Sequence, residues 1–223
     1  MEDVVSLLQC AQSLSLRVKG VAFHTGSGGV QYASYESSIV NARKIFDMAL
    51  ELGMQPMDLL DIGGGFTLIL PNSSKNFDEV APRINTLLET HFPEDSVQII
   101  AEPGRYICES VVYLASCIIG QKTLESGNRH YYLNNGIYQG YMVRMFGEDM
   151  EIEPLDPSIS SRPCRNSTWW GQTCDSCDWV IKNKEHSEYE TGEWVLTCNH
   201  GAYHKDLSCT FNGFELPSVF YIF

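Results

Sequence analysis

The stretch LLDIGGGF, from Leu59 to Phe66, places three consecutive glycines directly after an apolar run that is typical of a buried strand. Similar junctions occur on either side of it, VAFHTGSGG at 21–29 and QIIAEPGR at 98–105. Each joins a β-rich run to a glycine-containing loop, and helical patterns separate the three. Strands that alternate with helices in this way predict a parallel sheet, either open or closed into a barrel.

The first half of the chain follows this alternation from a short amphipathic stretch onward. Gly53 stands where a helix C-cap glycine belongs. Three βα units are too few to close an eight-stranded barrel and leave strand edges unpaired, so we expect a part of a barrel whose remainder is missing upstream. The expected elements are strands over 18–23, 57–62 and 97–101 and helices over 34–52 and 77–92.

The second half has a different pattern, without a strong helical repeat. Its extended candidates are separated by Gly, Pro, Asn and Asp. We therefore predict two domains, a partial α/β barrel over residues 1–110 and a mainly antiparallel β domain over residues 111–223. The candidate strands are VVYLASCIIG at 111–120, HYYLNNGIY at 130–138, DWVI at 178–181, GEWVLTC at 192–198 and SVFYIF at 218–223.

The charge of the chain excludes some classes of partner. The formal net charge is -13, from 28 acidic and 15 basic residues, and Lys and Arg form no cluster. Such a chain repels phosphate backbones and anionic lipid headgroups, so we expect neither a nucleic acid nor a membrane as partner. The N-terminus lacks the basic residues of a secretory signal, and no apolar run approaches the ~20 residues of a membrane span. We expect a cytoplasmic protein.

The eight cysteines are scattered through a chain long enough to fold without disulfides, and free thiols are expected in a reducing compartment. Cys174 and Cys177 form a CxxC motif. Zinc is not favoured, because Cys198 and His200 are poorly spaced as the second ligand pair, and a redox motif normally begins a helix after a strand. Two interpretations remain: Cys174 is a functional thiol next to Asp175, or it is a buried cysteine in a turn. We expect no metal.

The three strand-end loops predict a ligand site. Carboxyl ends of parallel strands converge on one mouth, and glycine amides there can cradle a phosphate, with a hydroxyl from Ser27 and the charge of Arg105. The alternative for Gly63–Gly65 is a tight turn or close backbone packing. His24 is either a satisfied buried histidine or an imidazole stacked on an aromatic ring. Glu102 either pairs with Arg105 or faces a ring nitrogen.

Six motifs, in this order along the chain, resemble eukaryotic ornithine decarboxylase, a pyridoxal-phosphate-dependent family of the alanine-racemase-like class. The resemblance covers nearly the whole chain and implies a pyridoxal 5'-phosphate-binding (β/α)8 TIM-type barrel, here its C-terminal part, followed by the β domain. The motifs are His24-Thr-Gly-Ser-Gly, Leu60-Asp-Ile-Gly-Gly-Gly-Phe, Ala101-Glu-Pro-Gly-Arg-Tyr, Trp170-Gly-Gln-Thr-Cys-Asp, Gly201-Ala-Tyr and Thr210-Phe-Asn-Gly-Phe.

The resemblance also implies roles for individual residues. Glu102 pairs with the pyridine nitrogen of the cofactor, and His24 lies over its ring. Cys174 directs reprotonation of the decarboxylated carbon, and Asp175 binds the distal ammonium of the substrate. The residues implied for the phosphate cradle are Ser27, Gly63, Gly64, Gly65, Gly104, Arg105 and Tyr203.

The resemblance implies decarboxylation of ornithine to putrescine by a homodimer with shared active sites. A second substrate-binding acid is expected near Glu148 or Asp149, where the alignment is poor. No lysine stands in the context of the family's cofactor-binding lysine, so the isolated chain is expected to be inactive. Antizyme is not carried over as a partner, because the family's antizyme-binding segment is absent. The alternatives are a non-catalytic regulator resembling antizyme inhibitor and a decarboxylase of arginine, lysine or another amino acid.

Overall fold

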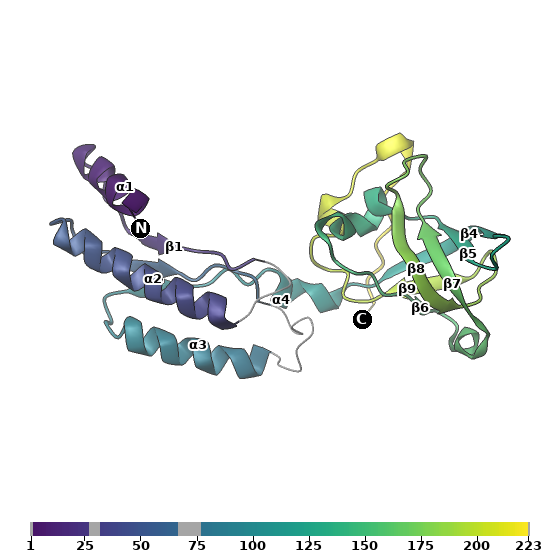
Figure 1. The fold of residues 1–223 in the computed structure, drawn as a ribbon, viewed down its shortest axis with the longest axis horizontal. Coiled ribbons are helices and arrows are strands. Elements are labelled where there is room, and N and C mark those ends of the chain that lie inside the picture. The colour runs from purple at the N-terminus through teal and green to yellow at the C-terminus, as the bar shows by residue number, and fades with distance from the viewer. Residues whose placement is uncertain (1, 27–31, 67–76, 223) are drawn as a thin grey trace. The chain divides into compact units, whose positions relative to one another are not determined.

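The computed structural model describes residues 2–26, 32–66 and 77–222. The chain divides into two compact units, Met1–Ile107 and Cys108–Phe223 (Figure 1). This division falls a few residues before the domain boundary expected after residue 110. Each unit has its own hydrophobic core and is described by itself.

Unit 1 is built on a parallel sheet in the order β1-β2-β3. In its register Val21 lies opposite Leu60, and Leu60 lies opposite Ile99. The three expected strands are therefore present, although each is shorter than the apolar run that predicted it. The elements of unit 1 are α1 (Glu2–Ser13), β1 (Gly20–Ala22), α2 (Tyr32–Glu51), β2 (Leu59–Asp61), α3 (Phe77–His91) and β3 (Gln98–Ile100), and α4 (Arg105–Cys108) ends at the division.

Helices α2 and α3 pack side by side along this sheet (Figure 1). Each buries one stripe of side chains at spacings of three and four residues, as an amphipathic helix does. The α2 helix ends as its sequence predicted: Gly53 has a φ of +72°, and the amide of Met54 donates to the Ala49 carbonyl at 3.0 Å. The buried residues are Tyr35, Ile39, Ala42, Phe46 and Ala49 on α2 and Val80, Ile84 and Leu88 on α3.

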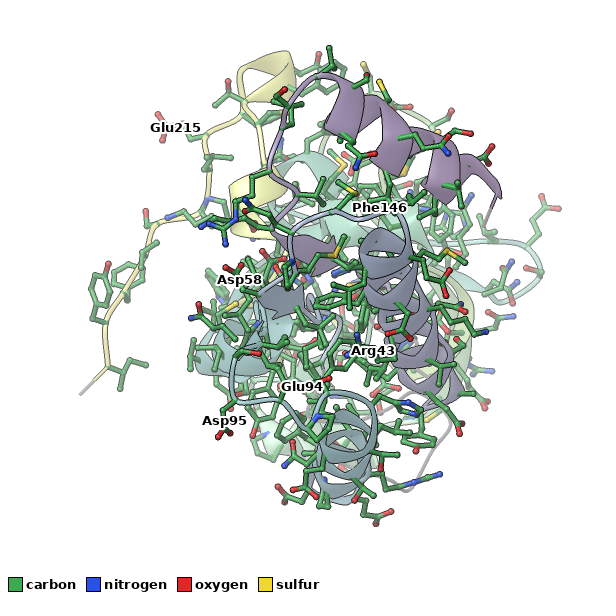
Figure 2. All side chains as sticks on the ribbon, turned by 90° about the vertical axis from the view of Figure 1, so that its left-hand side faces the viewer. Arg43, Asp58, Glu94, Asp95, Phe146 and Glu215 are labelled. Atoms are coloured by element: carbon green, nitrogen blue, oxygen red, sulfur yellow. The ribbon has the colours of Figure 1, made fainter. Side chains whose placement is uncertain are left out.

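An arginine on α2 ties that helix to the loop that follows α3. The Arg43 guanidinium pairs with Glu94 at 3.2 Å and with Asp47 at 2.8 Å, and Figure 2 labels Arg43 and Glu94 close together. Its carbon centre also lies 5.1 Å from the ring centroid of Phe92. A planar guanidinium suits this combination of ion pair and aromatic contact.

Strand β3 is an edge of the described sheet and is unusually open. Ile99 and Ile100 are 38 % and 37 % exposed, whereas Leu60 in the neighbouring β2 is fully buried. Parallel sheets normally have both faces covered. The exposed edge, together with helices packed along the strands, confirms the prediction of a partial barrel.

Unit 2 contains a six-stranded sheet in the order β6-β9-β4-β5-β7-β8. Its neighbours are antiparallel except for β5 and β7, which run parallel. The expected mainly antiparallel domain is thus confirmed, with one parallel pair. The strands are β4 (Leu114–Thr123), β5 (Arg129–Leu133), β6 (Glu153–Pro154), β7 (Cys164–Trp170), β8 (Trp179–Ser187) and β9 (Trp194–Thr197).

Short 3-10 and π segments connect these strands. The π segment η2 contains Gly140, whose ψ of -23° with extended φ interrupts the helical geometry. The segments are η1 (Glu109–Val111), η2 (Ile137–Tyr141), η3 (Met142–Phe146), η4 (Pro157–Ser161), η5 (Lys205–Leu207) and η6 (Phe211–Gly213).

The core of unit 2 centres on aromatic rings from β5 and β7. Trp169 is fully buried and Tyr131 is 1 % exposed, and their ring centroids lie 4.4 Å apart. Tyr189 meets both rings edge to face, at 5.8 Å from Tyr131 and 5.1 Å from Trp169. Aromatic pairs in this geometry stabilise a core beyond the area that they bury.

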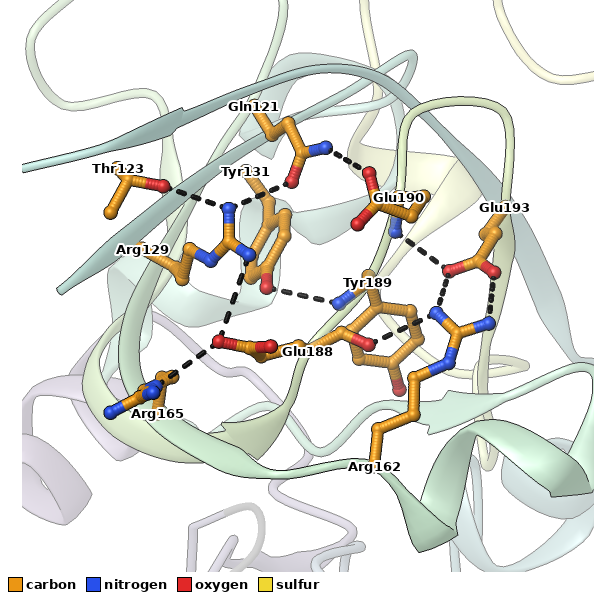
Figure 3. Close-up of polar contacts among 10 residues, drawn as sticks. All are labelled: Gln121, Thr123, Arg129, Tyr131, Arg162, Arg165, Glu188, Tyr189, Glu190 and Glu193. Atoms are coloured by element: carbon orange, nitrogen blue, oxygen red, sulfur yellow. Dashed lines mark hydrogen bonds and ion pairs between the residues drawn. The ribbon is translucent and has the colours of Figure 1, made fainter. Parts of the chain in front are cut away.

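Charged residues join the strand ends around this aromatic core (Figure 3). The Arg162 guanidinium donates two hydrogen bonds to the Glu193 carboxylate, at 2.6 and 2.9 Å, and a third to the Glu188 carbonyl at 3.2 Å. The Glu188 carboxylate pairs with Arg165 at 3.1 Å and with Arg129 at 3.6 Å. The network connects β5, β7 and β8 to the turn before β9.

Two expectations for unit 2 were wrong in part. SVFYIF was expected to be a strand, but residues 218–222 form none, and Phe220 and Ile222 are 84 % and 96 % exposed. An apolar run needs a hydrogen-bonding neighbour to become a strand, and no described strand pairs with this one. HYYLNNGIY was expected to be extended throughout, but its strand ends at Leu133 and Ile137 begins η2.

No helix among the described residues is long and apolar enough to cross a membrane. All eight cysteines are free. Within the described ranges, no group of three or more His, Cys, Asp or Glu side chains could hold a metal ion.

Candidate functional site

The glycines after β2 allow three strand-end segments to meet backbone to backbone. Gly63 has a φ of +62°, and a Cβ on it would lie 2.0 Å from the carbonyl oxygen of Phe23. A Cβ on Gly64 would lie 2.6 Å from the carbonyl oxygen of Glu102. The Glu102 amide also donates to the Gly63 carbonyl at 2.7 Å. The loops after β1, β2 and β3 therefore converge, as their positions in the sequence predicted.

Two of the three glycine amides are already hydrogen-bonded within the chain. Gly63 donates to an Asp61 carboxylate oxygen at 2.8 Å, and Gly64 donates to Nδ1 of His24 at 3.2 Å. Close backbone packing, the alternative interpretation of the triplet, thus accounts for Gly63 and Gly64. Gly65 has a φ of +97° and is partly exposed. Of the three glycine amides expected to bind an anion, only that of Gly65 remains a candidate donor in this loop.

His24 and Glu102 are brought to one place by their contacts with Gly64. Because Nδ1 of His24 accepts the Gly64 amide, the ring carries its proton on Nε2 when neutral. The Cε1 atom of His24 lies 3.2 Å from the Cβ position of Gly64, on which the Glu102 carbonyl also closes. Both residues are exposed. The roles expected for His24 and Glu102 toward a ring stay predictions.

Two side chains that the sequence analysis did not single out make hydrogen bonds to the backbone of Gly64. The Tyr35 hydroxyl donates to the Gly64 carbonyl at 3.0 Å, and the Thr25 hydroxyl approaches the same oxygen at 3.4 Å. Burial raises the pKa of Tyr35, so its hydroxyl stays protonated as a donor. Asp61 lies two residues before Gly63, and that position could have indicated its role. Tyr35 carries no such signal, because it lies on the core face of α2.

For the other residues expected around a phosphate, the structure gives only their position and exposure. Gly104 is exposed on the loop after β3, and Arg105, the first residue of α4, is 5 % exposed. Ser27 lies outside the described residues. The role of these residues in binding a phosphate stays a prediction.

In unit 2, Asp175 lies on the β7–β8 loop with two donors. Its carboxylate accepts from the Cys177 amide at 2.9 Å and makes a short hydrogen bond with the Tyr138 hydroxyl. These bonds, the Cys177 amide first, hold the pKa of Asp175 below its ordinary value. The hydrogen bond between Tyr138 and Asp175 is also the main reason that the pKa of Tyr138 rises to about 12. The pair is thus a carboxylate and a neutral phenol.

Asp178 fixes this loop and was missed by the sequence analysis. It is 1 % exposed and accepts from the Ile137 amide at 2.8 Å and from the Thr173 amide and hydroxyl at 3.0 and 2.6 Å. A Cβ on Gly136 or Gly171 would lie 2.1 or 2.2 Å from its Oδ1 atom. The two glycines make room for the carboxylate, which joins the β7–β8 loop to η2.

Cys174 is exposed, so the interpretation of a buried cysteine in a turn is wrong. Its Sγ atom accepts from the Asn212 side-chain amide at 3.2 Å. Asn212 belongs to η6, and the neighbouring Phe211 ring stacks on Tyr138 with centroids 4.4 Å apart. The structure therefore gathers Cys174, Asp175 and Tyr138 beside η6.

Tyr203 lies on a loop between two buried histidines. It has a φ of +61° and is 39 % exposed, whereas His200 and His204 are 4 % and 2 % exposed and their ring centroids lie 3.7 Å apart. Burial, followed by the nearby His204, lowers the pKa of His200 to about 3. Glu148 is half-buried after η3. The roles expected for Tyr203 and Glu148 stay predictions.

The described residues form a parallel βα segment with glycines at its strand ends, followed by a mostly antiparallel sheet. Residues 1–109 match the family model of the pyridoxal-dependent decarboxylase, pyridoxal binding domain. Residues 66–201 match the model of the pyridoxal-dependent decarboxylase, C-terminal sheet domain. The chain belongs to the pyridoxal-dependent decarboxylase family.

Curated relatives include both enzymes and a regulator. The chain is 37 % identical to ornithine decarboxylase of Cricetulus griseus over 97 % of its length and 50 % of that protein. It is 40 % identical to antizyme inhibitor 2 of Xenopus laevis over 96 % of its length and 50 % of that protein. The chain thus spans about half the length of the curated relatives it matches.

Solved structures of this family share the fold. The arginine decarboxylase of Paramecium bursaria Chlorella virus superposes with a TM-score of 0.89 at 32 % identity, covering 99 % of this chain and 59 % of that one. The lysine/ornithine decarboxylase of Vibrio vulnificus, complexed with cadaverine, gives a TM-score of 0.86 at 29 % identity, over 96 % and 58 % of the two chains.

Proposed function

We propose that this chain supplies a cofactor-binding edge and the sheet domain of a pyridoxal-phosphate-dependent decarboxylase that converts ornithine to putrescine. The observation that carries this proposal is the corner at Gly64. There His24 and Glu102 meet at the carboxyl edge of the parallel sheet. Membership in the decarboxylase family supplies the class of reaction.

The corner fits the pyridine ring of the cofactor. Bound pyridoxal phosphate supplies a heterocycle that accepts the electron pair left when carbon dioxide departs. With the cofactor bound, Glu102 would hold a proton on the ring nitrogen, and His24 would contact the ring. The phosphate is proposed to bind Gly65, Gly104 and Arg105, with Ser27 and Tyr203 as further donors.

The β7–β8 loop fits a substrate with a distal ammonium group. Asp175 is ionised because the Cys177 amide and the Tyr138 hydroxyl stabilise its charge, so it can pair with that ammonium. Cys174 donates the proton that replaces the lost carboxyl group. Glu148 is proposed as the second acid. A second protomer supplies Cys174 and Asp175 to the cofactor, so the proposed unit of activity is a homodimer with shared sites.

The proposed activity needs a lysine that holds the cofactor covalently, and none of the lysines of this chain stands in the family's context for it. We therefore test the chain together with the amino-terminal half of Cricetulus griseus ornithine decarboxylase, produced as a second polypeptide. Purified assemblies receive carboxyl-labelled ornithine, arginine and lysine, and released carbon dioxide is counted.

We expect release from ornithine above that from arginine and lysine. An Asp175→Ala variant is expected to raise KM for ornithine at least tenfold, because a charge-assisted hydrogen bond is worth about 1.5–3 kcal/mol. The matched control is Glu125→Ala, an exposed acid on the loop between β4 and β5. No release from any substrate, with no cofactor absorbance, contradicts the proposal; preference for arginine or lysine corrects the substrate alone.

A second candidate function is a non-catalytic regulator. The 40 % identity to antizyme inhibitor 2 of Xenopus laevis favours it as much as the enzyme relatives favour catalysis. Capture of the tagged chain by immobilised antizyme, followed by competition with ornithine decarboxylase, tests this candidate. If immobilised antizyme does not capture the chain at micromolar concentrations, the regulator function is excluded.

A further inference from the structure

Arg144, on η3, is a charged side chain to which the proposed function assigns no role. The central carbon of its guanidinium lies 3.6 Å from the ring centroid of Trp179, the first residue of β8. Its Nη2 atom donates to the Cys177 carbonyl at 2.8 Å. Arg144 therefore joins η3 to the β7–β8 loop, two residues beyond Asp175 in the sequence.

Stability alone does not account for an arginine at position 144. Burial lowers the pKa of Arg144, because the protein takes its charge partly out of water. Its Nε atom is buried and has no hydrogen-bond partner in the part of the chain that the structure describes. An unpaired buried N–H costs free energy, and an apolar side chain of similar shape avoids that cost. The guanidinium thus points to a role beyond packing.

The backbone of Cys177 connects Arg144 to Asp175. Its carbonyl accepts from Arg144 and from the Trp179 amide, both at 2.8 Å. Its amide donates to the Asp175 carboxylate at 2.9 Å. Of the two donors to the carbonyl, Arg144 comes from a distant part of the sequence, whereas Trp179 lies two residues along the chain. The direction of the Cys177 amide is therefore fixed in part from η3.

The Asp175 carboxylate has a second donor from the segment that precedes η3. The Tyr138 hydroxyl, on η2, makes a short hydrogen bond with it. The η2 segment ends at Tyr141 and η3 begins at Met142, so the two run on without a gap. Two adjacent segments thus set the direction of one carboxylate, η2 through a hydroxyl and η3 through the Cys177 backbone.

We propose that Arg144 is a positioning residue that aims the Asp175 carboxylate at the distal ammonium group of the substrate, acting through the Cys177 backbone. This role rests on the proposed function, which pairs that ammonium with Asp175. Without the guanidinium, the Cys177 carbonyl loses its donor from η3, and the Cys177 amide holds the carboxylate less firmly. Substrate binding is weakened, whereas proton donation by Cys174 is not, so KM rises and kcat stays.

The pKa of Tyr138 distinguishes positioning from a simple loss of charge. The hydrogen bond to Asp175 is the main cause that raises it to about 12, and the charges of Asp178 and Cys177 add to the rise. If Arg144 supplied only a positive charge, Arg144→Met would raise this pKa further, because a nearby cation favours the tyrosinate. If Arg144 positions Asp175, the hydrogen bond weakens in the variant and the pKa falls toward the ordinary value of about 10. We expect the fall.

The pKa is read from the tyrosinate absorbance of the whole chain, as the difference between each protein and the same protein with Tyr138→Phe. The matched control is Lys182→Met, since Nζ of Lys182 lies 4.3 Å from the centroid of the same Trp179 ring and the change leaves Arg144 on the Cys177 carbonyl. Lys182→Met is expected not to lower the pKa. Arg144→Lys, which keeps the charge but loses the planar stacking, is the second variant and is expected to lower it less than Arg144→Met does. Tryptophan fluorescence reports whether each protein stays folded.

A rise or no change in the pKa of Tyr138 in both Arg144 variants overturns the positioning role, as does an equal fall in Lys182→Met. Unfolding of both Arg144 variants assigns the residue to stability and overturns the role as well. In the assembly with the amino-terminal half, Arg144→Met is expected to raise KM for ornithine about threefold at unchanged kcat. It is expected to add nothing in a chain that already carries Asp175→Ala. The titration needs no cofactor and no turnover, so it decides whether Arg144 positions Asp175 even if no assembly releases carbon dioxide and the proposed function fails.

Discussion

Gly63 and Gly64 exist as glycines because neighbouring backbones occupy the space of a side chain. The carbonyls of Phe23 and Glu102 lie 2.0 and 2.6 Å from their Cβ positions. A rigid carbonyl cannot move aside as a flexible side chain can. The site corner at Gly64 therefore depends on the absence of two methyl groups.

Gly64→Ala is expected to destabilise unit 1 by about 1–3 kcal/mol, the usual range for overpacking a filled position. Unit 1 contains no tryptophan, so unfolding is followed by circular dichroism of its helices in urea. Gly120→Ala serves as the control, because its new Cβ would meet only the Tyr132 ring at 3.8 Å. Equal midpoints for the two variants would show that the close approach at Gly64 does not exist.

The hydrogen bond between Tyr138 and Asp175 predicts how the pKa of Tyr138 changes when Asp175 is replaced. The hydrogen bond to Asp175 is the main cause that raises the pKa of Tyr138 to about 12. Asp175→Asn removes the charge, so this pKa is expected to fall toward the ordinary value of about 10. Tyrosinate absorbance, taken as the difference between each protein and the same protein with Tyr138→Phe, isolates this group. An unchanged titration in Asp175→Asn would exclude the hydrogen bond.

At the residue scale, the sequence predicted the convergence of the three strand-end loops but not the contacts within it. Glycines at three strand ends predicted that these loops converge. That Gly64 donates to His24 depends on the distance between segments forty residues apart, which no local pattern encodes. The same is true of Asp178, whose partners Ile137 and Thr173 come from separate loops.

At the element scale, the ion-pair network of Figure 3 holds the strand ends of unit 2. The Glu193 side chain is 24 % exposed and the Arg162 side chain 35 %, so water screens their attraction in part. The bidentate geometry and the connections through Glu188 distinguish this pair from an isolated surface ion pair.

Glu193→Gln is expected to lower the stability of unit 2 by about 1 kcal/mol. Hydrogen bonds from Arg162 lower the pKa of Glu193 below its unfolded value of about 4.3. Its contribution is therefore present above that pH and is lost as pH falls through the folded pKa. All four tryptophans lie in unit 2, so their fluorescence reports its unfolding. Glu151→Gln, which breaks an exposed ion pair with Lys184 in the same unit, is expected to have less than half this effect.

Beside Tyr203, the buried His200 ring lies against His204, and burial lowers the pKa of His200. The pKa of His200 is about 3 in the folded state, against about 6.5 unfolded. The unfolded state binds the extra proton, so stability is expected to fall as pH drops from about 6.5 towards 3, with a slope of at most about 1.4 kcal/mol per pH unit.

Replacement of His200 by leucine tests this dependence. His200→Leu is expected to flatten the decline in the tryptophan-monitored stability of unit 2 over that pH range, whereas His91→Gln at the end of α3 leaves it unchanged. A decline of equal slope in His200→Leu and the wild type would assign the acid sensitivity to other groups, such as the half-buried His186.

At this scale, hydrophobic periodicity predicted the helices correctly. The prediction of strands failed where pairing with a neighbouring strand decides whether a segment is extended. Spacings of three and four residues predicted α2 and α3, which end within two residues of the expected positions. The apolar run 218–223 looks like a strand, but its described residues have no partner strand. Strand β7 was missed because its first half, Cys-Arg-Asn-Ser, is polar. Its burial comes only from its neighbours β5 and β8.

At the scale of the whole molecule, the proposed function divides its residues between two units. Unit 1 carries His24, Gly64 and Glu102, and unit 2 carries Cys174 and Asp175. The family match and the six motifs predicted this division of labour. The substrate was not predictable to the same degree, because the relatives include decarboxylases of ornithine, arginine and lysine and a regulator.

The most direct measurement of the central claim is calorimetric titration of the chain with 4′-deoxypyridoxine phosphate, which lacks the aldehyde that reacts with surface lysines. Wild type is expected to bind one equivalent, and Glu102→Gln to bind at least tenfold more weakly, since it loses a charge-assisted hydrogen bond to the ring nitrogen. Glu94→Gln, on the loop after α3, should bind as wild type does. Equal affinity for all three proteins, or no binding by the wild type, would contradict the assignment of this edge to the cofactor.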